Sequence, residues 1–143
     1  QPYEELNRGA EQVPPGSQGL MFHPYLNGEL TPYNDPKLRG SYIGISAAHT
    51  KAHFTRATLE GVAFSLRECL ETLRSLNVEM SRVRIIGGGA KGSLWRQIVA
   101  DVLGLTLEKA KVDDSSFGSA MVAAVGIGWY DTFTQAAEAC VKI

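Results

Sequence analysis

Three consecutive glycines, Gly87 to Gly89, stand between a β-branched run and the start of a helical pattern. The alternation from Arg82 to Ile86 predicts a strand, and the residues from Leu94 onward predict a helix. Glycine lets a backbone approach a bound molecule closely, and the first turn of a helix presents unpaired N–H groups. The segment 82–97 therefore predicts a strand, a tight turn and a helix start. Its function is either to bind a ligand or only to pack closely.

The glycine spacing leaves the kind of ligand open. Gly87, Gly89 and Gly92 match G-x-G-x-x-G, a dinucleotide-binding pattern that is followed by an acidic residue about 20 positions later. Glu108 and Asp113 lie in that neighbourhood. That pattern normally opens its domain, however, whereas a long helix and two strands are predicted here before it. The phosphate-loop pattern G-x-x-x-x-G-K-[ST] is not met, so the turn predicts a nucleotide of unspecified kind.

The composition is that of an ordinary globular domain. The 143 residues are 44% hydrophobic and 20% charged, with a formal net charge of −1. This balance gives no support for binding to nucleic acid or to a membrane surface, and no apolar run approaches the length of a membrane span. We therefore expect a single domain in the cytoplasm.

Neither the cysteines nor the histidines form a recognisable metal site. Cys69 and Cys140 have no paired spacing, which argues against a disulfide framework or a cysteine-bound metal. His49 and His53 are four residues apart, but no third ligand accompanies them. A structural or capping role is the interpretation for both histidines.

The chain alternates between predicted strands and predicted helices. Strands are expected within 19–26, 41–46, 82–86 and 105–112, and helices within 1–18, 50–76, 94–103, 117–128 and 133–143. Thr50 is the candidate cap of the long helix, and the run from Asp113 to Ser116 is the candidate cap of the helix at 117–128. This alternation predicts an α/β domain.

Three details of this pattern carry further expectations. Gly61 follows Glu60 inside the long helix, where glycine costs about 1 kcal/mol, so another element should pack closely there. The small residues of the helix at 117–128 favour a position beside the glycine turn, leaving a slot for an adenine ring. Four charged residues in the loop 27–40 are expected to pair with one another, namely Glu29, Asp35, Lys37 and Arg39.

Several segments together resemble the C-terminal signature of the FGGY carbohydrate kinases. GSYIGI at 40–45 is followed, after seven residues, by HFTRATLE at 53–60. GVAF at 61–64, IGGGAK at 86–91 and WRQ at 95–97 continue the likeness in register. The resemblance runs from about residue 19 to residue 128. Within the family, the loop from Gly28 to Gly40 is most similar to that of the members that phosphorylate xylulose.

The resemblance implies an actin-like ATPase (ribonuclease H-like) domain, the C-terminal half of a two-domain sugar kinase, with residues 1–143 as a single partial domain. Such kinases transfer the γ-phosphoryl of Mg²⁺-bound ATP to a sugar hydroxyl. The resemblance of the loop suggests that the sugar here is D-xylulose. The general-base aspartate and the sugar pocket belong to the N-terminal domain, so no catalytic residue, no metal ligand and no independent kinase activity are expected in these residues. ATP or ADP would contact Gly87, Gly88, Gly89, Ala90, Gly92 and Ser93.

Two departures and two alternatives remain. The family loop usually has arginine where Leu30 stands, and the segment 114–116 lacks the usual glutamate and glycine. One alternative is a dinucleotide-binding (Rossmann-type) oxidoreductase domain, which requires Glu108 or Asp113 to reach a ribose. The other is a non-catalytic actin-like interaction module. Apolar surface at which the N-terminal domain would dock could also make the chain associate as a homodimer.

Overall fold

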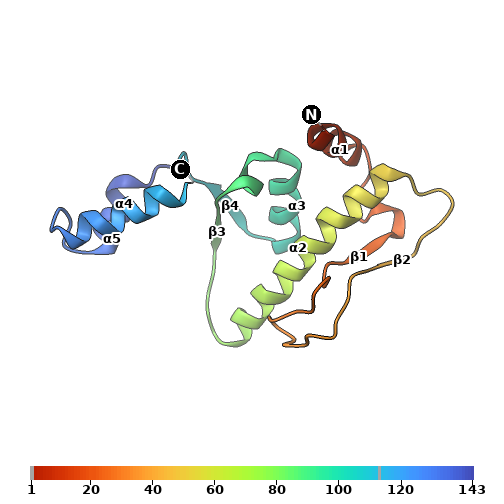
Figure 1. Cartoon of the computed structure of the whole chain (residues 1–143), viewed down its shortest axis with the longest axis horizontal. Helices are drawn as coiled ribbons and strands as arrows, with labels where there is room; N and C mark the ends of the chain where they lie inside the picture. Colours follow the sequence, from red (N-terminus) through yellow and green to blue (C-terminus); the bar gives the residue numbers. More distant parts are fainter. Residues whose placement is uncertain (1, 113) are drawn as a thin grey trace.

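The computed structural model describes residues 2–112 and 114–143, and a single long helix, α2 (Lys51–Ser75), lies at its centre (Figure 1). The helix begins where the sequence predicts, because Thr50 precedes it and the Thr50 backbone N–H donates to Nδ1 of His53 at 3.2 Å. Helix α1 (Pro2–Glu11), strand β1 (Met21–His23) and helix α3 (Ser93–Leu103) all pack against α2. The position of α2 therefore determines where these three elements lie.

The four predicted strands form two separate pairs. Strand β1 is antiparallel to β2 (Ser41–Ile43), with Phe22 opposite Tyr42. Strand β3 (Arg82–Ile85) is parallel to β4 (Thr106–Lys109), with Arg84 opposite Glu108. Helix α3 connects β3 to β4, as the crossover of a parallel pair requires. The strands are shorter than their patterns predict, but the α/β order is confirmed.

The hydrophobic core lies between α2 and α3. On α3, the residues that recur every three or four positions are buried, as the apolar periodicity predicts. The central cluster consists of Ala10, Ala63, Leu70, Leu94, Ile98, Val99 and Leu103. Val83 of β3 and Leu107 of β4 pack against this cluster, so the parallel strand pair is attached to the same core as α3.

Helix α2 approaches strand β1 very closely at Gly61. A Cβ atom at this position would overlap the carbonyl oxygen of Phe22 and lie 3.0 Å from its carbonyl carbon. The expectation that another element packs against Gly61 is therefore confirmed. A glycine weakens a helix because its backbone is flexible, and here that loss is accepted because no larger residue fits.

The neighbouring Glu60 is buried together with Arg56. Arg56 Nε donates to Glu60 Oε1 at 2.6 Å, and each side chain is only 8% exposed. The Gly16 N–H also donates to this carboxylate, at 3.1 and 3.2 Å from its two oxygens. Gly16 opens the turn Ser17–Gly19, in which Ser17 and Gln18 have positive φ angles. The buried ion pair thus anchors a turn that most residues do not readily adopt.

The loop between β1 and β2 is ordered differently from the prediction. Glu29 and Asp35 use their carboxylates to accept backbone N–H groups, from Leu30 and Lys37 respectively, and the two residues also exchange backbone hydrogen bonds with each other. Arg39 donates to two backbone carbonyls. The expected pairing among the loop charges is therefore wrong. Backbone groups without partners in an irregular loop compete successfully for these side chains.

Helices α4 (Ser115–Gly126) and α5 (Phe133–Cys140) pack on each other and project from the rest of the chain (Figure 1). Asp114 caps α4 by accepting the Ser116 N–H at 2.8 Å, whereas Asp113 lies outside the described residues. The expected position of α4 beside the glycine turn, with a slot between them, stays a prediction. Gly118 and Gly126 have no atom near the place of a Cβ, and Trp129 is 76% exposed. No helix in the described ranges is long and apolar enough to cross a membrane.

The close approach at Gly61 can be tested by Gly61→Ala. We expect this substitution to lower the free energy of unfolding by about 2 kcal/mol, because the clash is with backbone and not with a movable side chain. Urea denaturation followed by circular dichroism measures the change. Gly118→Ala is the matched control, since its Cβ enters open space within a helix, and should raise stability by about 0.5 kcal/mol. Equal effects of the two substitutions would contradict the packing described.

Candidate functional site

The glycine turn connects β3 to α3 as the sequence predicts. The chain leaves β3, passes through Gly87 with φ 78°, makes a 3₁₀ turn over Gly88–Lys91 and enters α3 at Ser93. Gly92 precedes α3 and provides no side-chain cap. The first N–H groups of α3 are therefore available for an acceptor from outside the helix, together with the positive end of the helix dipole.

The four glycines of this turn have two different roles. At Gly87 and Gly88 there is no atom within 4 Å of the place where a Cβ would be, and both residues are exposed. At Gly89 a Cβ would lie 3.1 Å from Trp95 Nε1, and at Gly92 it would lie 3.6 Å from Trp95 Cβ. Gly87 and Gly88 thus form an open backbone surface, whereas Gly89 leaves room for the indole of Trp95. At Gly92 a Cβ would make only an ordinary contact with Trp95.

Ala90 and Ser93 complete the predicted set and lie in opposite environments. Ser93 is exposed at the start of α3, whereas Ala90 is completely buried. The Ala90 N–H donates to Gly87 O at 3.0 Å, and its carbonyl accepts from Arg96 Nη1 at 2.5 Å. Ala90 therefore supports the turn from beneath. Arg96, which the sequence analysis does not propose as a site residue, holds the turn to the first turns of α3.

Glu108 is bound by two arginines of the neighbouring strand. Arg82 Nη1 and Arg84 Nη2 donate to its two carboxylate oxygens at 3.0 and 3.1 Å. The hydrogen bond from Arg84, with the charge of Arg82, keeps the pKa of Glu108 below its ordinary value of 4.5. Glu108 is thus already paired on the sheet, and the glycine turn follows the third strand and not the first. Both observations count against a dinucleotide-binding domain. Asp113 lies outside the described residues.

The histidines have the capping roles that the sequence suggests. His53 accepts the Thr50 N–H, and His49 Nδ1 accepts the Ser46 N–H at 3.1 Å. In the ranges 2–112 and 114–143, no three His, Cys, Asp or Glu side chains are grouped so that they could hold a metal ion. The described part of the chain therefore offers no built site for a metal.

The described structure also contains a cavity whose lining includes no residue of the glycine turn. It has a volume of about 690 Å³ and lies between α2, β1 and the following loop. Phe22, Tyr25, Tyr33 and Phe64 contribute to a mainly apolar lining, in which Glu60 also takes part. The glycine turn remains the candidate for a nucleotide, because its backbone is open and the first N–H groups of α3 lie beside it.

The chain is similar to known proteins in both sequence and structure. The chain is 42% identical over 142 residues to a xylulose kinase of Staphylococcus epidermidis, covering 99% of this chain and 29% of that protein. The ligand-bound xylulose kinase structure from Lactobacillus acidophilus superposes with a TM-score of 0.86 at 27% identity, covering 97% of this chain and 28% of that one. The Plasmodium falciparum glycerol kinase structure with ADP gives 0.78 at 28% identity, covering 92% and 26%.

These relatives define a class of proteins, the sugar kinases, whose C-terminal domain is an actin-like ATPase fold. A sequence model of the FGGY family of carbohydrate kinases, C-terminal domain, matches residues 1–127. The chain therefore belongs to the FGGY family and corresponds to its C-terminal domain. It spans about 29% of the length of the Staphylococcus epidermidis xylulose kinase.

The arginine contacts of Glu108 predict how its carboxyl group titrates. We expect Arg84→Gln to raise the pKa of Glu108 toward 4.5, because the hydrogen bond that favours its ionised form is lost. Carbon-detected NMR of the side-chain carboxyl during an acid titration measures this pKa. Arg74→Gln, which removes a contact to Glu71 instead, should leave the pKa of Glu108 unchanged.

The lowered pKa of Glu108 determines how this residue changes the stability of the fold with pH. Because the pKa is lower in the folded chain, the folded state binds fewer protons than the unfolded state as the pH approaches 4.5 from above. Glu108 thus stabilises the fold fully at pH values above its pKa in the unfolded chain. This stabilisation is lost as the pH falls through its lower pKa in the folded chain. An unchanged Glu108 pKa in Arg84→Gln would show that the arginine contact is absent in solution.

Proposed function

We propose that this chain is the ATP-binding part of a carbohydrate kinase that transfers the γ-phosphoryl group of ATP to a sugar hydroxyl, with D-xylulose as the sugar. The observation that carries the proposal is the open backbone surface at Gly87 and Gly88, next to the uncapped start of α3. Backbone without side chains, beside free helical N–H groups, suits a nucleotide that needs both close contact and polar partners.

The roles of the individual residues follow from their positions. Gly87 and Gly88 would lie against the adenosine, and Gly92 and Ser93 would approach it from the helix start. Gly89 and Ala90 would support this surface from its inner side. Gly89 leaves room for Trp95, and the Ala90 carbonyl accepts a hydrogen bond from Arg96. The similarity to a glycerol kinase whose structure contains ADP supports an adenine nucleotide as the ligand.

Phosphoryl transfer places few chemical demands on this part of the protein. The reaction depends mainly on positioning and on stabilising charge, and ATP supplies the group that is transferred. The turn would hold the nucleotide and exclude water from one side of it. The acidic residues described here form no metal cluster, so we assign Mg²⁺ to no residue of this chain. The general base and the sugar contacts are likewise assigned to none of its residues.

The choice of sugar rests on similarity alone. The extensive match to xylulose kinases favours D-xylulose, and the structural similarity to a glycerol kinase leaves other polyols as the competing substrates. The loop that most resembles that of the xylulose-phosphorylating members is shaped by backbone hydrogen bonds to the Glu29 carboxylate, but it carries Leu30 in place of arginine. A cytoplasmic location and association as a homodimer stay predictions.

The nucleotide site can be tested by titrating the chain with ADP. We expect ADP to shift the backbone amide NMR signals of residues 87–93, because this backbone would contact the adenosine directly. NAD should give equal or weaker shifts. Mapping the shifts in ¹⁵N spectra at increasing ADP concentration gives both the location and the dissociation constant. Shifts confined to the 690 Å³ cavity would contradict the proposed location.

Gly88→Ala tests the role of the open surface. Its Cβ enters empty space, so the fold should be unaffected, while the methyl group would occupy the place of the nucleotide. We expect the dissociation constant for ADP to rise about tenfold, which corresponds to ~1.4 kcal/mol. Gly126→Ala, at another glycine with open space, is the matched control and should bind ADP like the unmodified chain. Normal ADP affinity in Gly88→Ala would exclude contact at this glycine.

A further inference from the structure

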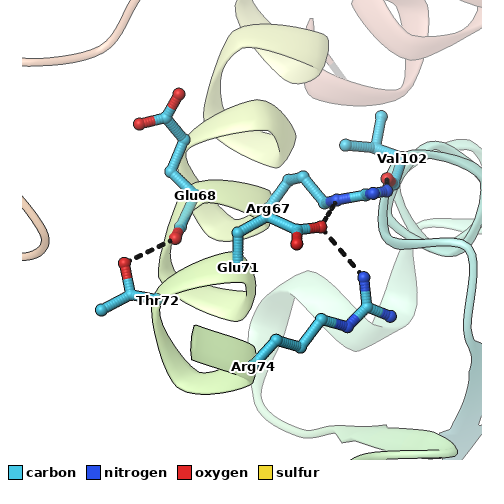
Figure 2. Close-up of polar contacts among 6 residues, drawn as sticks. All are labelled: Arg67, Glu68, Glu71, Thr72, Arg74 and Val102. Atoms are coloured by element: carbon cyan, nitrogen blue, oxygen red, sulfur yellow. Dashed lines mark hydrogen bonds and ion pairs between the residues drawn. The ribbon is translucent and has the colours of Figure 1, made fainter. Parts of the chain in front are cut away.

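Arg67 of α2 binds the far end of α3. Its Nη1 donates to the carbonyl oxygen of Val102 at 2.8 Å, and its Nε donates to Glu71 Oε1 at 2.5 Å. Glu71 also accepts from Arg74 Nη1 at 2.9 Å. Figure 2 shows the Arg67 guanidinium extending from α2 toward Val102, with the Glu71 carboxylate between the two arginines. This side chain thus connects two helices through a hydrogen bond between residues that are 35 positions apart in the sequence.

The location of Val102 explains why this contact matters. The last four carbonyl groups of a helix have no partner inside it, and a cation near them interacts favourably with the helix dipole. Val102 is the second-last residue of α3, and Arg67 satisfies its carbonyl. The Arg67 side chain is 40% exposed, so its ion pair with Glu71 adds little to stability. The geometry therefore indicates a role in orientation more than in stability.

The other end of α3 carries the glycine turn. Arg96 of α3 binds the Ala90 carbonyl, and the Arg96 backbone N–H donates to Gly92 O at 3.1 Å. Between the two ends, α3 has 11 residues and a length of about 16 Å. Its buried face packs on the core through Leu94, Ile98, Val99 and Leu103. Because α3 is one continuous helix, we expect a displacement of its end at Val102 to displace the turn at its other end as well.

We propose that Arg67 is a positioning residue for nucleotide binding, which sets the orientation of α3 and thereby the position of the backbone at Gly87 to Ser93. This inference rests on the function proposed above, because it assumes that the turn binds an adenine nucleotide. Arg67 itself contacts no part of the turn. Glu71 assists it by holding the guanidinium in the direction of Val102.

Arg67→Met tests the proposal in the full 143-residue chain, because it keeps an unbranched side chain and removes the guanidinium. Two measurements are made well below the thermal midpoint. We expect the amide NMR signals of residues 87–93 to shift in the absence of nucleotide. We also expect the dissociation constant for ADP, measured by calorimetry, to rise roughly three- to tenfold, in the range found for residues that couple two sites.

Two further variants separate orientation from stability. Arg74→Met removes the second arginine from Glu71, but Arg74 has no hydrogen bond to α3 in the described structure, so ADP affinity should be unchanged. Arg67→Lys keeps a cation for the Val102 carbonyl and should restore most of the affinity lost in Arg67→Met. If Arg67→Met does not fold, Arg67→Lys and Arg67→Gln are compared instead, and tighter ADP binding by the lysine variant is expected.

The outcomes distinguish the inference from the proposed function. A lower thermal midpoint in Arg67→Met, with unchanged amide signals at 87–93 and an ADP dissociation constant within about twofold of the original, would overturn the positioning role. Equal ADP affinities of the lysine and glutamine variants would overturn it as well. If the unmodified chain fails to bind ADP, the proposed function fails for this chain, and the amide signals of the nucleotide-free variants still decide whether Arg67 orients the turn.

Discussion

The contact between α2 and β1 at Gly61 is the constraint on which the structure depends. It brings the helix so close to the Phe22 carbonyl that only glycine fits, and the adjacent Arg56–Glu60 pair is buried as a result. Burying two charges is costly unless their hydrogen-bonding groups are satisfied. Here the carboxylate also receives the Gly16 N–H, and no buried side-chain polar atom in the described structure lacks a partner. With α2 fixed in this way, its other face can serve as the support for α3.

The parts of the fold and site that the sequence predicts are those encoded by neighbouring residues. Alternation before Gly87 and periodicity after Gly92 locate the strand, the turn and the helix, because side-chain direction repeats with a fixed period in each element. The cap at Thr50 is equally local. Gly61 is an instructive intermediate case: its unfavourable position inside a helix predicts a close neighbour but does not identify Phe22 as that neighbour.

The features that escape prediction depend on residues far apart in the chain. Nothing near Arg67 in the sequence indicates that it binds the carbonyl of Val102, and nothing near Ala90 indicates that it is wholly buried. The small residues of α4 predict a helix that approaches a neighbour closely, but they do not identify that neighbour. In the described structure α4 packs on α5. Local patterns thus specify surfaces that must be covered, whereas tertiary structure decides what covers them.

The side chain of Leu30 takes no part in shaping the loop between β1 and β2. Its side chain is 78% exposed, and the loop around it is shaped by backbone hydrogen bonds to Glu29 and between Glu29 and Asp35. The architecture of the loop therefore does not depend on the side chain at position 30. The loop can thus keep its backbone path with any side chain at position 30, provided that the carboxylates of Glu29 and Asp35 are present.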